Sequence, residues 1–275
     1  MSRAPLRPRH APSTERFSEP PKKSLGQNFL HERGVIDRIV LAIAPKPGEH
    51  LVEIGPGQGA LTFPLLDRHG ALTAIEFDRD LLAPLSTQAA AHGQLTLVHA
   101  NVLDVDLTAL AAGTPIRLVG NLPYNLSSPI LFHALAHAAV ITDMHFMLQK
   151  EVVERMAAGP GSKVYGRLSV MLQAWCEVTA LFTVGPGAFK PPPKVDSAVV
   201  RLRPRAPETV GIDDPGRFAD IVRAAFGQRR KTLRNALGTV CDEATIRAAG
   251  IDPQQRAEQL AVADFVRLAN QAPAA

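Results

Sequence analysis

The chain has 275 residues, of which 46% are hydrophobic and 20% charged, with 30 Lys and Arg against 26 Asp and Glu. These values predict a soluble globular protein with one large domain and a small appendage, and they exclude a membrane-spanning or wholly disordered chain. The net charge of +4 is small, so the distribution of basic residues is more informative than their excess. The two cysteines form neither a Cys-x-x-Cys pair nor a zinc-ligand cluster, so we expect a protein of the reducing cytoplasm that binds no metal.

Residues 1–23 are rich in Pro and Arg and poor in large apolar side chains. Such a segment cannot bury enough surface to fold by itself, so we expect a disordered basic N-terminal tail. A solvated tail and an arm that contacts phosphates would both have this composition. The sequence leaves these two alternatives open.

From residue 50 to residue 205, apolar runs alternate with segments of helical spacing. Ser127 or Ser128 suits the N-cap of the third helix, with Pro129 in its first turn. The alternation predicts βαβ units and a doubly wound, mostly parallel, seven-stranded α/β sheet, closed by an antiparallel pair. The expected strands are 50–54, 72–77, 95–100, 116–120, 145–148, 178–184 and 197–202, and the expected helices are 58–68, 80–91, 128–136 and 151–158.

After Pro207 the pattern contains helices and no strands. Helical spacing covers 220–226, 230–240, 243–249 and 261–270. We therefore expect three parts: the tail at 1–23, an α/β domain at 24–207 and a small all-α domain at 208–275.

A glycine-rich loop joins the first expected strand to the first expected helix, and it contains Gly55, Gly57 and Gly59. Glycines at this position permit a tight turn and a close approach of the backbone to a ligand. Glu76 closes the second strand about 20 residues later, where a carboxylate can accept hydrogen bonds from a ribose diol. A solvated carboxylate at a strand end is the alternative for Glu76. Together the two features indicate an adenosine-containing cofactor, with NAD among the candidates.

The fourth strand ends in Asn121-Leu122-Pro123-Tyr124, whose residue types suit methylation of an aromatic amine. The lone pair of an exocyclic adenine amine is delocalised into the ring, which makes the nitrogen a poor nucleophile. Asn121 Oδ1 and the Leu122 carbonyl could accept both N–H groups and localise that lone pair, because Pro123 restricts the residue before it. Tyr124 offers a face on which a base can stack. An ordinary turn is the alternative, since Asn and Pro are common turn residues.

Five basic residues lie close together in the helical part, with no acidic residue among them. They are Arg223, Arg229, Arg230, Lys231 and Arg234. Basic side chains on such a helix would contact phosphates, so we expect the all-α domain to bind RNA. A solvated helix face is the alternative.

Taken together, these motifs resemble the bacterial ribosomal small-subunit adenine dimethyltransferase family, from Lys23 to about Leu268. The matching segments are Gly26–Leu30, Val52–Gly57, Ile75–Leu81, Gly120–Asn125, Met147–Val152, Tyr165–Val170, Phe189 with Pro191–Ser197, and Phe226 with Gln228–Lys231.

This resemblance implies an S-adenosylmethionine-dependent enzyme that converts two adjacent adenines of a 16S rRNA hairpin to N6,N6-dimethyladenosine. It implies that Asn28 and Leu30 cover the cofactor, that Gly55 lies under the methionine part with Gly57 also at the cofactor, and that Glu76 holds the ribose. It also implies that Phe189 stacks on the target base opposite Tyr124. The implied partner is the small ribosomal subunit or its precursor (pre-30S), bound by a monomer in the cytoplasm.

Position 101 departs from the family pattern. The third strand of the family usually ends in an Asp that accepts a hydrogen bond from the cofactor's adenine amine, whereas this chain has Asn101 there. An amide oxygen can still accept this bond, but without charge assistance. Asp104 could compensate, so the contact to the adenine is open between these two residues.

Three other functions compete with this one. A macrolide-resistance type adenine methyltransferase of the large subunit shares the glycine loop and a similar Asn-Leu-Pro-Tyr motif, but the segments at 165–170 and 191–197 favour the small-subunit family. A mainly non-catalytic ribosome assembly factor is a second alternative. An NAD dehydrogenase is the third, and this function would leave the tetrapeptide at 121–124 unexplained.

Overall fold

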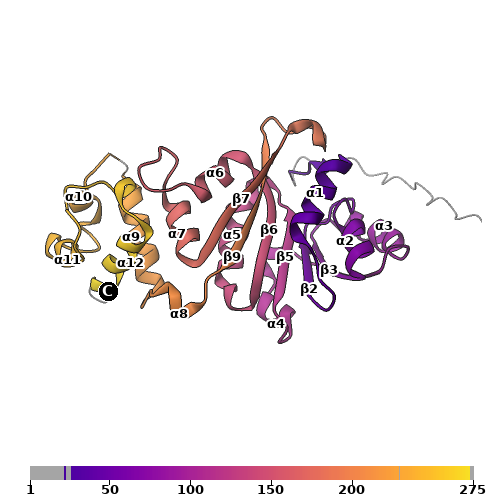
Figure 1. Cartoon of the computed structure of the whole chain (residues 1–275), viewed down its shortest axis with the longest axis horizontal. Helices are drawn as coiled ribbons and strands as arrows, with labels where there is room; N and C mark the ends of the chain where they lie inside the picture. The colour runs from indigo at the N-terminus through magenta and orange to yellow at the C-terminus, as the bar shows by residue number, and fades with distance from the viewer. Residues whose placement is uncertain (1–21, 23–25, 229, 273–275) are drawn as a thin grey trace, which may run out of the picture.

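A seven-stranded sheet forms the centre of the protein in the computed structural model, which describes residue 22 and residues 26–228 and 230–272 (Figure 1). Its strand order is β4-β3-β2-β5-β6-β9-β7. The strands are β2 (His50–Ile54), β3 (Ala71–Glu76), β4 (Gln94–His99), β5 (Ile116–Asn121), β6 (Ile141–Gln149), β7 (Cys176–Val184) and β9 (Ser197–Pro204). The pairs from β4 to β6 are parallel, and β9 is antiparallel to both β6 and β7. The expected mostly parallel, seven-stranded sheet is therefore confirmed.

Both faces of the sheet are covered, which explains why its central strands are apolar almost throughout. Neighbouring residues point to opposite faces, so Leu118 and Val119 belong to two different cores. One core is closed by helices α1 (Arg33–Ile43), α2 (Thr62–His69) and α3 (Arg79–Ala89). The other is closed by α4 (Leu107–Ala111), α5 (Ser127–Ala136), α6 (Lys150–Ala157) and α7 (Arg167–Trp175). The first helix, α1, and α7 had no counterpart in the sequence prediction.

The predicted N-cap of α5 was wrong. The helix is preceded by Leu126 at the N-cap position, and Ser127 is already its first residue. The Ser127 hydroxyl donates to the Pro123 carbonyl at 3.2 Å instead of capping the helix. The physical reason is the turn before it, because η3 (Tyr124–Leu126) coils the chain directly after Pro123. Helix α2 likewise begins later than predicted, since the glycine loop continues in turns as far as residue 61.

The remaining helices lie together at one end of the molecule (Figure 1). They are α8 (Pro207–Val210), α9 (Pro215–Gly227), α10 (Leu233–Leu237), α11 (Glu243–Ala248) and α12 (Val262–Gln271). Their core includes Phe218 and Phe265, and it also takes in Tyr165, which precedes α7. The Tyr165 hydroxyl donates to the Leu260 carbonyl at 2.9 Å, so the helical group packs directly against the α6–α7 connection.

The predicted helix at 230–240 is much shorter in the structure. Helix α10 begins only at Leu233, because the N–H groups of Leu233 and Arg234 donate to the carbonyls of Gln255 and Pro253. It ends before Gly238. Of the helices within the described residues, none combines the length and the apolar character needed to cross a bilayer.

A separate two-stranded sheet joins the N-terminal segment to the connection between β7 and β9. Its strands are β1 (Phe29–Leu30) and β8 (Phe189–Lys190), and they pair antiparallel. This pairing holds residues 26–30 at the edge of the main sheet where β2, β3 and β5 end.

Candidate active site

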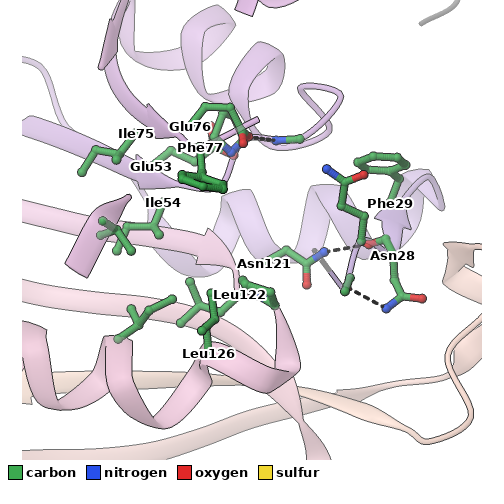
Figure 2. A pocket seen from close by; sticks show the side chains of 18 of the residues that line it. Asn28, Phe29, Glu53, Ile54, Ile75, Glu76, Phe77, Asn121, Leu122 and Leu126 are labelled. Carbon is green, nitrogen blue, oxygen red and sulfur yellow. Dashed lines mark hydrogen bonds between the residues drawn. The ribbon is translucent and has the colours of Figure 1, made fainter. Parts of the chain in front are cut away.

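A cavity of about 260 Å³ lies at the carboxyl ends of the parallel strands (Figure 2). In open α/β sheets, ligands bind at this edge. Segments that are distant in sequence form its walls: residues 26–30, 53–58, 75–77, 100–103 and 121–126. The glycine loop and the Asn121 tetrapeptide therefore line the same cavity.

The glycine loop approaches the cavity with bare backbone. Gly55 and Gly57 have φ values of +67° and +56°, in the left-handed region that favours glycine. A Cβ added at Gly55 would have no atom within 4 Å, so it would project into open space. A Cβ at Gly57 would lie 3.2 Å from the ring of Phe29. The loop thus leaves room for a ligand at Gly55 and is covered by Phe29 at Gly57.

Glu76 lies next to the glycine loop, at the end of β3, with 6% of its surface exposed. Burial is the largest influence and raises the pKa of its carboxyl, while backbone N–H groups act in the opposite direction. Oε1 accepts from Asp78 N at 2.7 Å, and Oε2 accepts from Gly57 N at 3.2 Å. Because each oxygen retains a further lone pair, this fixed carboxyl can still accept hydrogen bonds from ligand hydroxyls.

Glu53 is a second carboxyl in the cavity wall, and the sequence analysis missed it. Its side chain is 1% exposed, and burial raises its pKa to about 8. The Thr62 hydroxyl donates to Glu53 Oε2 at 2.6 Å. The signal in the sequence was a single acidic residue within an otherwise apolar strand.

Asn121 ends β5 with its amide turned toward the N-terminal segment (Figure 2). Its Nδ2 donates to the carbonyl of Asn28 at 3.1 Å. This bond fixes the orientation of the amide and leaves Oδ1 as a hydrogen-bond acceptor in the cavity wall.

The next three residues place an aromatic ring beside that amide. Leu122 is buried and donates its N–H to the Met147 carbonyl at 3.1 Å, which ties the segment to β6. Pro123 has an extended backbone, and the 3-10 turn η3 follows it. Tyr124 lines the cavity, and its Oη lies 2.6 Å from Ser197 Oγ. Burial raises the pKa of the Tyr124 phenol, with the bond to Ser197 opposing it.

Residues 26–30 cover one side of the cavity, with Asn28 and Leu30 among its lining residues. Gln27 Nε2 donates to Asp78 Oδ2 at 2.9 Å. Lys22 Nζ lies 2.6 Å from the other oxygen of Asp78 and 2.5 Å from Asp80. These contacts connect the start of the described chain to the N-terminus of α3, just after Glu76, and sequence reasoning gave no sign of them.

Of the two residues left open for the adenine contact, Asn101 lines the cavity and Asp104 is exposed outside it. Asn101 Oδ1 accepts from Leu103 N at 3.2 Å, which caps the 3-10 helix η2 (Val102–Asp104). The amide oxygen therefore already holds one hydrogen bond of the chain itself, and one lone pair remains.

Phe189 does not lie where the resemblance implied. Its side chain is 2% exposed and packs in the core beneath α1 and α2, and it is not among the residues that line the cavity. The reason is the β1–β8 pairing, which sets Phe189 opposite Leu30. In this arrangement the ring presents no face to a base opposite Tyr124.

The basic residues of the helical part are spread over two helices and the turn between them. Arg223 lies on α9 and pairs with Asp220 at 2.7 Å, and Arg234 lies on α10 at 3.7 Å from Glu243. Arg230 and Lys231 are exposed in the turn between the helices. The expectation that Arg230 and Lys231 begin a helix was therefore wrong, because α10 starts only at Leu233. The prediction for Arg229 falls outside the described residues.

Comparison with known proteins bears directly on this cavity. Residues 19–273 match the family model described as ribosomal RNA adenine dimethylase. A protein from Xanthomonas oryzae pv. oryzae (strain PXO99A), named ribosomal RNA small subunit methyltransferase A, is 74% identical over 94% of this chain and 98% of its own length. A protein of the same name from Xanthomonas euvesicatoria pv. vesicatoria is 75% identical over 92% of this chain and 97% of its own.

Two solved structures are similar over most of the chain. A dimethyladenosine transferase from Plasmodium falciparum superposes with a TM-score of 0.73 at 25% identity, covering 87% of this chain and 95% of that one. The 23S rRNA methyltransferase ErmE superposes with a TM-score of 0.69 at 27% identity, covering 89% and 99%.

The sheet order, the inserted antiparallel strand β9 and these neighbours define the fold of a Rossmann-like S-adenosylmethionine-dependent methyltransferase. The chain belongs to the ribosomal RNA adenine dimethylase family, and it is an rRNA methyltransferase.

Proposed function

We propose that this protein transfers methyl groups from S-adenosylmethionine to N6 of two adjacent adenines in a 16S rRNA hairpin, giving N6,N6-dimethyladenosine during small-subunit biogenesis. The observation that carries the proposal is the Asn121 amide. Asn28 holds its nitrogen, so its oxygen is an acceptor in the cavity that Glu76 also lines. The names of the relatives at 74–75% identity support the small subunit as the source of the substrate.

The residues of the cavity fit this cofactor. Glu76 would accept hydrogen bonds from its ribose hydroxyls, Gly55 leaves the backbone clear beside its methionine part with Gly57 in the same loop, and Asn101 would accept from its adenine amine. Asn28 and Leu30 would cover it from the side. When bound, S-adenosylmethionine supplies a methyl group made electrophilic by its sulfonium.

The protein's own contribution is to position the amine of the target adenine. Asn121 Oδ1 and the Leu122 carbonyl would accept its two N–H groups, which draws the nitrogen toward tetrahedral geometry and localises its lone pair. The ring of Tyr124 would stack on the base after it leaves the RNA helix. No base is needed before transfer, because the amine proton becomes acidic only once the nitrogen is alkylated.

The proposal also includes the domain organisation, the location and the partner of the protein. We place the methyltransferase domain at 24–207, the RNA-binding domain at 208–275 and the basic tail at 1–23, and we place the protein in the cytoplasm as a monomer that binds pre-30S particles. Phosphate contacts would come from the basic residues Arg223, Arg229, Arg230, Lys231 and Arg234. Of these, Arg230 and Lys231 are exposed between α9 and α10.

The decisive experiment incubates purified 30S and 50S particles, from cells that lack this protein, with the enzyme and S-adenosylmethionine. Mass spectrometry of the rRNA should find dimethyladenosine at two neighbouring positions of 16S rRNA and no new modification in 23S rRNA. Because the structure is also similar to ErmE, methylation of 23S rRNA alone is the specific alternative, and that result would overturn the proposal. A catalytically inactive variant that fully restores subunit maturation in cells would instead favour an assembly factor.

A further inference from the structure

The ring of Tyr124 is held at its far end by a residue 73 positions away in the sequence. Its Oη lies 2.6 Å from Ser197 Oγ. Ser197 has 0% of its surface exposed, whereas Tyr124 is half-buried and lines the cavity. The hydrogen bond therefore runs from the wall of the site into the interior of the protein.

Ser197 is a rigid partner because of its place in the sheet. It is the first residue of β9, and it pairs on one side with Gln149 of β6 and on the other with Val184 of β7. Because β9 is paired on both sides, the Ser197 hydroxyl cannot move with the Tyr124 ring. The hydrogen bond between them therefore restrains Tyr124.

The near end of Tyr124 is fixed independently. The N–H of Leu126 and the hydroxyl of Ser127 both donate to the Pro123 carbonyl, at 3.0 and 3.2 Å, which closes the turn that carries Tyr124. With the backbone and the hydroxyl both held, the ring is confined to one χ1 rotamer, because another rotamer would carry Oη away from Ser197. Without the hydrogen bond, the Tyr124 side chain would sample several rotamers. It would then lose rotamer entropy when a base stacks on its ring.

We propose that Ser197 is a positioning residue, whose hydroxyl holds the Tyr124 ring in the orientation in which the target adenine stacks on it. The inference rests on the proposed function, because it takes the adenine as the group that meets Tyr124. It assigns no contact between Ser197 and the substrate or cofactor.

The test compares Ser197→Ala and Tyr124→Phe, which remove the same hydrogen bond from its two ends and keep the ring. We expect each variant to lower the single-turnover rate at saturating 30S particles by about 3- to 10-fold, as befits one hydrogen bond. The KM for the particles should stay unchanged, since docking depends on phosphate contacts made before the base is extruded. The double variant should be no slower than either single variant, because both remove one interaction.

Tyr165→Phe is the matched control. It removes the other tyrosine hydroxyl of the chain, which also forms a buried hydrogen bond, but within the helical group. This variant should lose stability without any change in the single-turnover rate. Ser197→Thr retains a hydroxyl and should recover most of the rate that Ser197→Ala loses.

The inference is overturned if both Ser197→Ala and Tyr124→Phe match Tyr165→Phe in rate, or if their losses multiply in the double variant. Tyr124→Ala separates this failure from that of the proposed function. If Tyr124→Ala is inactive while the two hydroxyl variants are fully active, only the role of Ser197 is wrong. If Tyr124→Ala also retains the wild-type rate, the stacking role and the role of Ser197 both fail.

Discussion

The two ends of strand β5 carry polar residues that are used differently, of which Arg117 is buried and Asn121 is half-buried. Near its start, the Arg117 guanidinium donates to both oxygens of Asp143, to Glu49 and to the carbonyl of Ile43, at 2.6–2.9 Å. At its end, the Asn121 amide donates once, to Asn28, and its oxygen lines a cavity. Only four positions separate the two residues, and both interrupt an apolar strand.

The difference lies in how much hydrogen-bonding capacity the chain itself uses. Arg117 joins α1 to β5 and β6, and its partners lie within the protein. The Asn121 amide is fixed through its Nδ2, but its Oδ1 can still accept a hydrogen bond from a ligand. A buried polar residue therefore indicates a binding site only when its capacity remains open and it borders a cavity, and otherwise it indicates structure.

Replacing Arg117 should have the largest effect, and this effect should be on stability. Arg117→Met leaves Asp143 buried without its cation, which costs about 3–5 kcal/mol in the free energy of unfolding. Urea unfolding would measure the loss, while the methylation rate of the folded variant should match that of the wild type. Arg247→Met, which removes an exposed ion pair to Glu243, is the control and should leave the urea midpoint unchanged. A stable Arg117→Met variant with impaired catalysis would show that Arg117 serves the site and not the fold.

Asn121→Ala should have the opposite profile. We expect the single-turnover rate to fall by about 10²- to 10³-fold, as for the loss of one hydrogen-bonding group aimed at the reacting atoms. The unfolding midpoint should change little, and calorimetry should find S-adenosylmethionine affinity within about twofold of the wild type. The exposed Asn235→Ala is the control. Wild-type turnover by Asn121→Ala would remove the basis of the assignment.

The pH dependence of stability tests the role of Glu53, a buried polar residue that borders the cavity. Because burial raises the pKa of its carboxyl from 4.5 to about 8, the folded state holds this proton more tightly than the unfolded state. The stability contribution is thus complete below pH 4.5 and is lost as the pH rises toward 8. The Glu53→Gln side chain does not titrate. Between pH 4.5 and pH 8, its free energy of unfolding relative to that of the wild type should therefore rise with pH, by at most about 1.4 kcal/mol per pH unit. Thermal unfolding from pH 5 to pH 8 measures the difference, and parallel profiles would contradict it.

The smallest expected effect concerns the turn between α9 and α10. Arg230→Ala and Lys231→Ala should each weaken binding to 30S particles and reduce the slope of log affinity against log salt by about one. Filter binding at several salt concentrations would measure this slope. Lys46→Ala, on the far edge of the sheet, should leave it unchanged. A slope unaffected by either variant would show that these residues are solvated and not phosphate-bound.

The sheet could be predicted because its signals are local. The apolar strand at 50–54 ends at a glycine, and its bounds agree with β2. Helix α1 also had a readable pattern, since Ile36, Ile39 or Val40, and Ile43 recur at helical spacing, but its N-cap is Glu32, which is not a favoured residue type there. The start of α10 at Leu233 was not predictable, because the hydrogen bonds of Leu233 and Arg234 to Gln255 and Pro253 decide where it begins.

The lining of the cavity was predictable where residues stand at the ends of strands, as with Glu76 and Asn121. It was not predictable where a partner lies far along the chain. Asn28 meets Asn121 across 93 positions, and Ser197 meets Tyr124 across 73. The burial of Phe189 depends in the same way on the β1–β8 pairing. Motif spacing reports the residue types that a site needs, but not which of them face the cavity.

The contact from the Asn28 carbonyl to Asn121 has a consequence for trimmed forms of the protein. A chain that starts after residue 30 would retain the strands of the main sheet, the glycine loop and Glu76. Its Asn121 amide would lose the hydrogen bond to Asn28 and could swivel about χ2, presenting its nitrogen to the cavity as readily as its oxygen. Under the proposed mechanism, shortening the leading end of this protein would therefore weaken the grip of Asn121 on the amine of the target adenine, although Asn121 itself is unchanged.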